Sequence, residues 1–330
     1  MPPNAEPSST QKHLLQNKPE IPCRNVCSCL GDPRAGFSVA ATGYDFEYRT
    51  CRNQFEIRRA ADCDLLYVFP QPCAEALATI YPPEYIPFQF HQLHGPVRWA
   101  RDFVQGRKAK AILQLARETG KILDVGTGSG ILLRQIARVK GSTKDLYAND
   151  FSDSILAPLR KKGFQTLIGQ AETLETAERF AVICMNQVLE HLQNPVSVVH
   201  RLSTLLAPGG YLFIETPNIA SLDARIFGAR FWGGYHIPRH FWLFSEKSLR
   251  QLLTSAGLCV TRVRYLASPA FWIQSVHHLL LDRGWFKTAR FFSEKNPLLL
   301  APATILDLLT GALGGKTSNI RIVAQKQAES

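Results

Sequence analysis

Residues 121–130, KILDVGTGSG, place one acidic residue ahead of three glycines at alternate positions. The acidic residue is Asp124, and the glycines are Gly126, Gly128 and Gly130. Glycine has no Cβ and adopts positive φ readily, so a turn of this kind lets a ligand lie directly on the backbone. Apolar residues recur at helical spacing over 130–140, and the first N–H groups of that helix point back at the loop. The segment therefore predicts a strand, a ligand-binding loop and a helix.

The spacing of these glycines differs from that of dinucleotide-binding loops, which follow G-x-G-x-x-G and face a pyrophosphate. Here the pattern is D-x-G-x-G-x-G. It resembles motif I of the class I methyltransferases that depend on S-adenosylmethionine (SAM), and the resemblance implies SAM as the cofactor. SAM has no phosphate, but its amino-acid end carries an ammonium group. The carboxylate of Asp124 suits that ammonium, directly or through water.

A second acidic residue, Asp150, ends a strand predicted at 145–150. An acidic residue at a neighbouring strand end can accept from both hydroxyls of a ribose, and SAM has such a ribose. Asn149 is the competing candidate, but the alternation along the strand and the Phe-Ser that follows favour Asp150. The alternative is a structural role, in which Asp150 starts a turn or caps the next helix.

The ends of the next two strands complete the cofactor site that the resemblance implies. Gln170 follows the strand at 164–169, where the family places an acidic or amide side chain against the adenine amino group, and usually Asp. Gln can still accept from that amine. After the strand at 181–187, the family's Leu-Glu-His signature stands at 189–191. The predicted cofactor-binding residues are Asp124, Gly126, Thr127, Gly128, Gly130, Asp150, Phe151, Gln170, Ala171, Glu172, Asn186 and Gln187.

Candidates for acceptor chemistry lie in residues 231–242, FWGGYHIPRHFW, which follow the fifth strand, where this fold places the acceptor. Aromatic walls exclude water and hold flat or apolar acceptors. Because an imidazole titrates near neutral pH, His240 is the first candidate for a general base and His236 the second. His191 is a further candidate, and the alternative is that Glu190 and His191 cap the following helix and support the site. The alternative for the segment is that its residues only pack or bond locally.

Strands and helices alternate along much of the chain, which is typical of βαβ units with a parallel sheet covered on both faces. The predicted fold class is α/β, a Rossmann-like, seven-stranded, mostly parallel sheet with helices on both faces. An insert at about 267–317 contains apolar runs that Pro302 and Asp307 interrupt, which predicts short packed helices. Strands are predicted at 122–126, 145–150, 164–169, 181–187, 211–216, 259–265 and 319–324, and helices at 92–119, 130–140, 153–162, 195–206 and 245–257.

Eight cysteines occur, six of them within residues 23–73. Many members of the family carry an N-terminal zinc ribbon, and residues 63–72 resemble the end of that ribbon. Ala60, however, stands where the second knuckle needs a cysteine. A tetrahedral structural site needs four ligands, which Cys27, Cys29, Cys51 and Cys63 could supply only with altered geometry. Two interpretations stay open, a bound zinc ion or a degenerate ribbon that has lost its metal.

The chain has 330 residues, of which 45% are hydrophobic and 20% charged, as in globular proteins with an ample core. Three parts are predicted: a disordered tail at 1–22, the degenerate ribbon-like segment with its connector at 23–90, and a methyltransferase domain at 91–330 that contains the insert. No run approaches about 18 apolar residues, and the start has no apolar core of a secretory signal. These features predict a cytoplasmic protein.

The net charge is +11. A solvated basic surface explains it, and the alternative is an anionic partner such as a membrane surface, nucleic acid or an acidic substrate. Nucleic acid is disfavoured because no aromatic-basic RNA-binding motif accompanies the charge. The apolar insert leaves open a peripheral association with a membrane.

The resemblance extends through residues 210–218 to 244–245, and is to the subgroup that contains the ubiquinone-biosynthesis O-methyltransferases and enzymes of envelope and secondary-metabolite pathways. It implies transfer of a methyl group from SAM to a small-molecule, lipid-linked or sugar-linked acceptor, with oxygen as the favoured acceptor atom. The alternatives are N- or C-methylation of a sugar or metabolite, a non-catalytic SAM-binding regulatory subunit, and an RNA methyltransferase.

Overall fold

The structure is a computed structural model that describes residues 15–28, 30, 32, 34–82, 95–117, 120–293 and 296–328, without the side chains of residues 95–100 and 297. The chain forms two compact units, each assembled from three segments. Unit 1 comprises Met1–Pro83, Thr216–Leu249 and Arg264–Ile320, and unit 2 comprises Glu84–Glu215, Arg250–Val263 and Arg321–Ser330. The predicted boundaries after residue 22 and after residue 90 stay a prediction. Residues 1–14 of the predicted tail lie outside the described residues.

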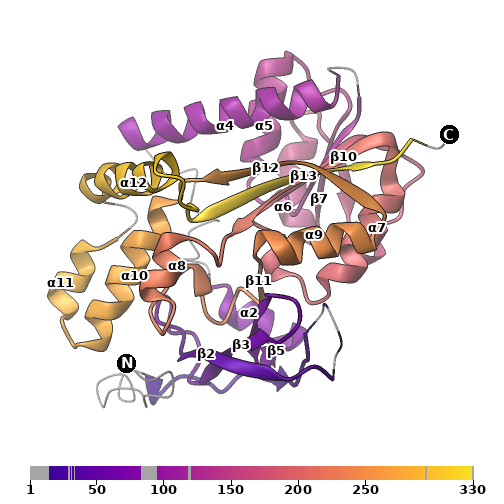
Figure 1. Cartoon of the computed structure of the whole chain (residues 1–330). Coiled ribbons are helices and arrows are strands. Elements are labelled where there is room, and N and C mark those ends of the chain that lie inside the picture. Colours follow the sequence, from indigo (N-terminus) through magenta and orange to yellow (C-terminus); the bar gives the residue numbers. More distant parts are fainter. Residues whose placement is uncertain are drawn as a thin grey trace. The chain divides into compact units, whose positions relative to one another are not determined.

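Unit 2 is built on a seven-stranded sheet with the order β12-β13-β10-β9-β6-β7-β8 (Figure 1). The pairs β10–β9, β9–β6, β6–β7 and β7–β8 are parallel. The strand order reverses between β6 and β9, and open α/β sheets bind ligands at the carboxyl ends of their strands at such a reversal. The strands are β6 (Ile122–Val125), β7 (Leu146–Asp150), β8 (Gln165–Ile168), β9 (Phe180–Asn186), β10 (Leu206–Pro217), β12 (Leu258–Leu266) and β13 (Asn319–Lys326).

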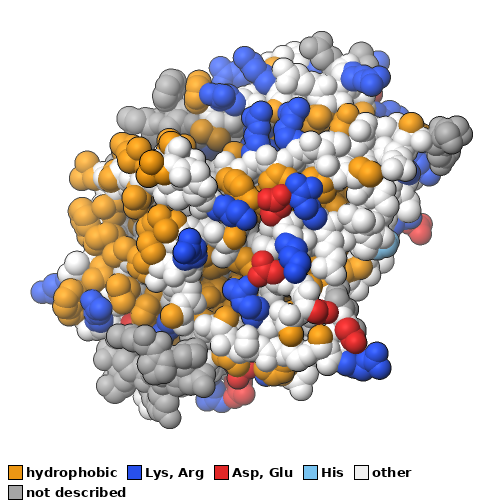
Figure 2. All heavy atoms as spheres, viewed as in Figure 1, with side chains coloured by type: hydrophobic (Ala, Val, Ile, Leu, Met, Phe, Trp, Pro, Cys, Tyr) orange, Lys and Arg blue, Asp and Glu red, His pale blue; other side chains and the backbone are white. Residues whose placement is uncertain are grey.

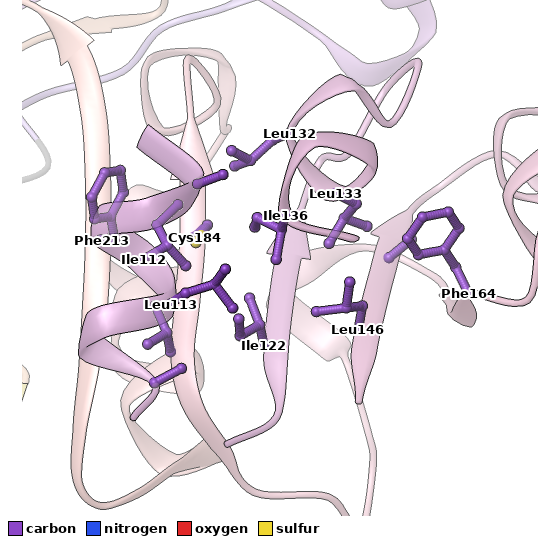
Figure 3. Close-up of a cluster of buried hydrophobic side chains, with 14 of the residues drawn as sticks. Ile112, Leu113, Ile122, Leu132, Leu133, Ile136, Leu146, Phe164, Cys184 and Phe213 are labelled. Carbon is purple, nitrogen blue, oxygen red and sulfur yellow. The ribbon is translucent and has the colours of Figure 1, made fainter. Parts of the chain in front are cut away.

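One apolar core joins three helices to a face of this sheet (Figure 3). Ile112, Ile122 and Ile136 are fully buried in it. Burying one such side chain stabilises the fold by about 1.5–3 kcal/mol. The helices of this core are α4 (Gly95–Leu115), α5 (Ile131–Lys140) and α6 (Asp153–Arg160), whereas α7 (Pro195–Leu205) lies against the opposite face (Figure 1).

The predicted alternation of strands and helices in unit 2 is confirmed, and so is the α/β class. The largest difference is β10, which begins at Leu206 rather than at residue 211. Leu206 already pairs with Phe180, and the register then shifts before Tyr211. Pro208, Gly209 and Gly210 thus lie inside the strand, where they form an irregularity.

Unit 1 contains a four-stranded sheet with the order β11-β4-β3-β2 and a separate pair, β1–β5. The neighbouring strands of both sheets are antiparallel. The segment predicted as a degenerate ribbon therefore shares a sheet with residues that follow β10. The strands are β1 (Cys23–Arg24), β2 (Phe37–Gly43), β3 (Phe55–Ala60), β4 (Leu66–Phe69), β5 (Gln71–Pro72) and β11 (Trp242–Leu243).

The helices of unit 1 include the predicted insert. They are η1 (Ala74–Ala76), α2 (Leu77–Ile80), α8 (Leu222–Phe227), η5 (Gly233–Tyr235), α10 (Pro269–Asp282), α11 (Phe286–Phe291) and α12 (Pro297–Ala312), while α9 (Glu246–Ser255) begins in unit 1 and ends in unit 2. The expected break at Pro302 and Asp307 is wrong, because α12 runs through both residues. Asp307 is buried and accepts from the backbone N–H of Ser268 at 2.8 Å, so it anchors the helix instead of ending it.

Candidate active site

The glycine loop of unit 2 follows β6 at the reversal of strand order. Gly126, Gly128 and Gly130 adopt φ of +62°, +50° and +71°. A Cβ at Gly126 would lie 2.8 Å from Val188, and one at Gly130 would lie 2.4 Å from Leu159. A Cβ at Gly128 would meet nothing within 4 Å. The outer glycines are thus required by packing, and Gly128 faces open space that a ligand can occupy.

Asp124, at the third position of β6, is 3% exposed and lies just below this loop. Thr127 donates its hydroxyl to the Asp124 carboxylate at 2.8 Å. Burial raises the pKa of Asp124 to about 7, although the Thr127 hydrogen bond and the charge of Lys108 oppose that rise. A cation that binds beside a buried carboxyl favours the ionised form of that carboxyl and lowers its raised pKa.

Asp150 ends β7, beside the glycine loop. Its carboxylate accepts from the N–H of Gly128 at 3.2 Å and from that of Ser152 at 3.3 Å. Burial raises the pKa of Asp150 above its usual value. The competing residue, Asn149, is 2% exposed and donates its amide to the carbonyls of Leu167 and Gly169, so it joins β7 to the end of β8. Asp150, rather than Asn149, is thus the side chain directed at the loop.

Two apolar side chains stand exposed at neighbouring strand ends. Phe151 follows β7 and is 73% exposed, and Ile168 ends β8 and is 58% exposed. Asp150 pairs with Ile168 in the sheet, and Phe151 directly follows Asp150. The two apolar side chains therefore stand at the ends of neighbouring strands. A planar apolar ring such as adenine would cover them. Ile168 was not predicted. Gln170 is exposed beyond it, and Ala171 and Glu172 open the short helix η3 (Ala171–Thr173).

These observations show that the residues present fit SAM. The open space at Gly128 offers the backbone cradle, and the buried carboxyls of Asp124 and Asp150 offer partners for an ammonium and for hydroxyls. The exposed pair, Phe151 and Ile168, offers an apolar surface for a ring.

A buried charge network that was not predicted stands at the ends of β9 and β10. Lys108 of α4 donates to Asn186 at 2.7 Å and forms an ion pair with Glu215. Glu215 also pairs with Arg321. Burial would raise the pKa of Glu215, but the two cations outweigh it and hold that pKa below its usual value. Asn186 is thereby fixed in place, and no sequence motif marks Lys108.

The role of helix cap predicted for Glu190 and His191 is wrong. Both lie in the short helix η4 (Leu189–His191), and Asn194 caps α7 by accepting from the N–H of Ser197 at 3.1 Å. Asn194 is the better cap because it directly precedes Pro195, the first residue of the helix. Gln187 adopts φ +56° and donates its N–H to the carbonyl of Glu215 at 2.9 Å.

The histidines predicted for acceptor chemistry lie in unit 1. His236 is 9% exposed, and its Nδ1 lies 2.8 Å from Glu47. His240 is 5% exposed, and its Nδ1 lies 2.8 Å from the carbonyl of Gly234. Their rings are 4.8 Å apart between centroids. Glu47 lies in the loop between β2 and β3, far from both in sequence, so local motifs could not find it.

A buried ion pair holds this loop and the histidine segment together. Arg239 donates two hydrogen bonds to Asp45, at 3.0 and 2.8 Å, and both side chains are fully buried. Arg239 also donates to the carbonyl of Ile80 at 2.6 Å. Burial would raise the pKa of Asp45, but Arg239 outweighs it and lowers the pKa to about 2.

Three of the four predicted zinc ligands fall in the part of unit 1 that the structure describes. Cys27 is exposed, Cys51 and Cys63 are buried, and these three do not form a cluster of metal-ligating side chains there. Cys63 instead bonds to the carbonyl of Leu30 at 3.4 Å. Cys29 lies outside the described residues, so the four-cysteine site stays a prediction, and no chemistry is derived from it.

A family model described as a methyltransferase domain matches residues 99–263, which is half of the chain. The chain belongs to the methyltransferase-domain family. The resemblance to class I SAM-dependent methyltransferases is thus confirmed, and SAM is supported as the cofactor of this methyltransferase.

Curated relatives of the methyltransferase include ubiquinone biosynthesis O-methyltransferases. The protein from Photorhabdus laumondii is 37% identical over 107 residues, which cover 30% of this chain and 43% of that enzyme. The protein from Acinetobacter baylyi is 29% identical over 167 residues, covering 46% of this chain and 64% of that enzyme. The chain thus matches less than two thirds of the length of these relatives.

Among solved structures, a Burkholderia thailandensis 1,6-didemethyltoxoflavin-N1-methyltransferase with bound S-adenosylhomocysteine aligns with a TM-score of 0.47 and 16% identity. That alignment covers 81% of this chain and 96% of the other. A Galdieria sulphuraria protein proposed to be a sarcosine dimethylglycine methyltransferase aligns with a TM-score of 0.46 and 15% identity over 69% of this chain and 86% of the other.

Proposed function

We propose that this methyltransferase transfers a methyl group from SAM to a hydroxyl oxygen of a small-molecule or lipid-linked acceptor. The observation that carries the proposal is the open backbone at Gly128 between two buried carboxyls, Asp124 and Asp150. The choice of oxygen is supported by the relatives, which are named as O-methyltransferases.

SAM, when bound, supplies a methyl group on a positively charged sulfur. The residues of unit 2 would hold and orient it: Asp124 would take the ammonium, Asp150 would take hydroxyls, and Phe151 would cover the ring. Orientation of two reactants accounts for as much as about 7–11 kcal/mol of a barrier. A base that removes the hydroxyl proton contributes a further factor of about 10²–10⁴.

The test is incubation of the full chain with methyl-labelled SAM and extracts of hydroxylated metabolites and lipids, followed by mass analysis of the labelled product. An O-methyl ether is the expected product. A product methylated at nitrogen or carbon would support the alternative of N- or C-methylation. SAM binding without any labelled product would support a regulatory subunit, and the absence of SAM binding would overturn the proposal as a whole.

We further propose that the methyltransferase works in the cytoplasm at a membrane surface, because α12 buries polar side chains and exposes apolar ones. Its buried side chains include Asp307 and Thr310, at 0% and 8% exposure. Its exposed side chains are large and apolar: Leu298, Ile305, Leu306, Leu308, Leu309 and, just after the helix, Leu313. A helix in water normally buries its apolar face and exposes its polar one. An apolar environment outside α12 accounts for this reversal.

Basic residues accompany the apolar surface. Arg283, Lys287, Arg290 and Lys316 are exposed on and beside α11 and α12, together with Trp285 and Phe291. Figure 2 shows apolar side chains gathered over the region of α10 to α12, with Lys and Arg side chains beside them. Apolar insertion with flanking cations suits an interface of anionic lipid. No helix among the described residues is long and apolar enough to cross a bilayer.

Vesicle sedimentation tests this association. The full chain should co-sediment with vesicles that contain phosphatidylglycerol and bind less to pure phosphatidylcholine. Leu308→Glu with Leu313→Glu should abolish co-sedimentation, because the two side chains are 56% and 87% exposed on that surface. Val139→Glu, at a 41% exposed apolar position on α5 of unit 2, is the matched control and should bind normally. Normal binding by the double variant would overturn the proposal.

A further inference from the structure

A row of polar side chains lies above the apolar core on one face of the sheet in unit 2. The members of that core on the central strands β6, β9 and β10 include Ile122, Cys184 and Phe213 (Figure 3). Side chains two residues apart on a strand share a face, so the next positions on this face are Asp124, Asn186 and Glu215. The apolar core thus ends in a polar row toward the carboxyl ends of the strands.

Lys108 of α4 contacts two members of this row. Its side chain is buried, and its ammonium donates to Oδ1 of Asn186 at 2.7 Å and forms an ion pair with Glu215. The other carboxylate oxygen of Glu215 pairs with Arg321 of β13. Burial raises the pKa of Asp124, and the charge of Lys108 opposes that rise, so Lys108 lies near this carboxyl as well. One buried ammonium therefore faces the whole row.

The ammonium of Lys108 decides which way the amide of Asn186 faces. An ammonium has three donors and no acceptor, so the Asn186 atom against it is the carbonyl oxygen, and the NH2 group points elsewhere. Asn186 is half-buried, and among the described residues its NH2 group has no protein partner but is not enclosed either. Its two N–H donors are therefore accessible to a ligand.

This NH2 group belongs to the strand end beside the glycine loop. Asn186 is the last residue of β9, one position beyond the pair formed by Val125 and Met185. Val125 ends β6, so Asn186 is level with Gly126, the first glycine of the loop. Asp124 lies on the neighbouring strand and the same face, two positions below Asn186. Donor and carboxyl thus border the reversal of strand order, where open α/β sheets bind ligands.

The chemistry of the NH2 group selects an oxygen. An amide N–H only donates, so it matches a lone pair of the ligand, whereas an ammonium would find no acceptor there. Lys108, on the other side of the amide, polarises its N–H bonds and strengthens a bond to a negatively charged oxygen. Asp124 offers the opposite chemistry, since its carboxylate accepts from an ammonium. The two side chains together match a group that carries both charges, such as the end of an amino acid.

We infer that Lys108 is a positioning residue, which holds Asn186 so that the amide donates to a negatively charged oxygen of a ligand at the glycine loop. The inference deepens the proposed cofactor site and rests on it. Such an oxygen has two sources, the carboxylate of SAM and the oxygen of a methyl acceptor that has lost its proton. No covalent bond is made or broken at Lys108 or Asn186, so their role is to bind and orient.

Two ligands that differ by one carboxylate test the first source. SAM and decarboxylated SAM share the adenosine, the sulfonium and the amine, and each is titrated calorimetrically into the full chain at pH 8. Asp124 is then mostly ionised in both titrations, since burial raises its pKa only to about 7. The native chain should bind SAM at least about tenfold more tightly than decarboxylated SAM, because the latter lacks a charged hydrogen-bond acceptor.

Asn186→Asp removes the donor with little change of shape. The new carboxylate keeps the contact with Lys108, but it cannot donate and it repels a second anion. The preference for SAM should therefore vanish or reverse, while decarboxylated SAM binds at least as tightly as it binds the native chain. Asn194→Asp is the matched control, because Asn194 is exposed and caps α7 by accepting from Ser197, which aspartate also does. The control should keep the native preference.

Lys108→Gln separates positioning from a merely structural role. A glutamine amide both donates and accepts, so Asn186 can then turn either its oxygen or its NH2 group toward the loop. The preference for SAM should fall between those of the native chain and Asn186→Asp, whereas a structural residue would weaken both ligands by the same factor. Lys108→Arg, whose guanidinium also lacks an acceptor, should retain the preference. Glu215 keeps Arg321 in both variants, and thermal unfolding shows that each is folded.

Turnover tests the second source. If the oxygen belongs to the acceptor, Asn186→Asp should keep the native ratio of the two Kd values and lower kcat by about 10²–10³. A native ratio together with native turnover in Asn186→Asp would overturn the inference and leave the proposed function intact. If the native chain gives no labelled product, the second source fails with the proposed function, and the ratio of Kd values alone decides. No binding of SAM by the native chain would overturn both.

Discussion

The cofactor site of unit 2 and the cluster of Glu47, His236 and His278 in unit 1 are built in opposite ways. In unit 2, Asp124 lies near the end of β6, Gly128 follows that strand and Asp150 ends β7, and the parallel sheet brings these strand ends together. In unit 1, Glu47 and His236 meet across 189 residues of chain, and His278 comes from a third segment. A local motif is enough to specify the first site, whereas the second depends on a complete tertiary fold.

The difference also appears in how each site holds its charges. Among the residues that the structure describes, Asp124 and Asp150 of unit 2 have no direct cationic partner, and burial raises the pKa of both. Unit 1 pairs Asp45 with Arg239 and Glu47 with His236, and both carboxyls keep a pKa below the usual value. The two carboxyls of unit 2 can therefore take a cationic group of a ligand, whereas the two carboxyls of unit 1 are already paired with basic side chains of the protein. Variants that change one charge or one Cβ at a time can separate the contributions of the two units.

The largest expected effect is on the stability of unit 1. Arg239→Met leaves the carboxylate of Asp45 buried without its partner, and breaking a buried pair costs about 3–5 kcal/mol. The midpoint of thermal or urea unfolding should fall accordingly, while SAM still binds the folded chain. Arg52→Met, which removes an exposed pair with Glu20, is the control and should cost at most about 1 kcal/mol. A loss no larger than that of the control would contradict the structural role of Arg239.

Two alanine variants in the glycine loop should behave differently from each other. Gly130→Ala forces a Cβ to within 2.4 Å of Leu159, so we expect a clear loss of stability as well as of SAM binding. Gly128→Ala meets no protein atom, so its stability should fall only by the left-handed penalty of about 1–2 kcal/mol. SAM affinity should nevertheless drop at least about tenfold, because the methyl group enters the cradle. Calorimetry and thermal unfolding measure both quantities, and unchanged affinity in Gly128→Ala would show that the ligand lies elsewhere.

The affinity for SAM should depend on pH through Asp124. The pKa of Asp124 is raised to about 7 in the free protein, and an ammonium beside it would lower that value. Binding then requires the loss of a proton below about pH 7, so the Kd should rise as pH falls, approaching tenfold per unit. Lys108 and Asp150 are the charged neighbours that modify the slope. Asp124→Asn should bind weakly at every pH, and a native Kd that is constant from about pH 5.5 to 7 would contradict this role.

A smaller effect is expected at Phe151. The side chain is 73% exposed, so Phe151→Ala should leave the unfolding midpoint nearly unchanged. Loss of an aromatic surface against a base costs about 1–3 kcal/mol, which corresponds to a Kd for SAM raised by roughly fivefold to a hundredfold. Phe37→Ala, at a 49% exposed position on β2 of unit 1, is the control and should leave the Kd unchanged. Equal Kd values for the Phe151 variant and the native chain would remove Phe151 from the site.

The sequence predicted most of unit 2, because its signals are local. The period of the apolar residues, the glycine spacing and the helix caps indicate the strands from β6 to β10 and the helices between them. Asp124 and Asp150 lie at or next to the ends of β6 and β7. Lys108 was not predicted, since its ion pair with Glu215 spans 107 residues and its helix carries no motif. Ile168 was not predicted either, because an exposed apolar side chain at a strand end looks like an ordinary strand residue.

In unit 1 the histidines were predicted, but their partners were not. The segment around His236 and His240 could be recognised by its aromatic composition alone. Glu47 and His278 carry no local signal, and their proximity to His236 follows only from the packing of three distant segments. The region of α12 was predicted as short packed helices interrupted at Pro302 and Asp307. Composition could not show that Asp307 turns inward and the leucines outward.

The central claim is that unit 2 binds SAM through the side chains at the ends of β6 and β7. A calorimetric titration of SAM into the native chain, Asp150→Ala and Asp153→Ala tests it most directly. Asp153, three residues farther on, is exposed and, within the described ranges, forms its ion pair with Arg160 alone, so it is a matched control. The native chain and Asp153→Ala should bind one SAM with the same Kd, and Asp150→Ala should bind at least about tenfold more weakly, since hydrogen bonds to a charged group contribute about 1.5–3 kcal/mol. No binding by the native chain, or equal Kd values for all three proteins, would contradict the account.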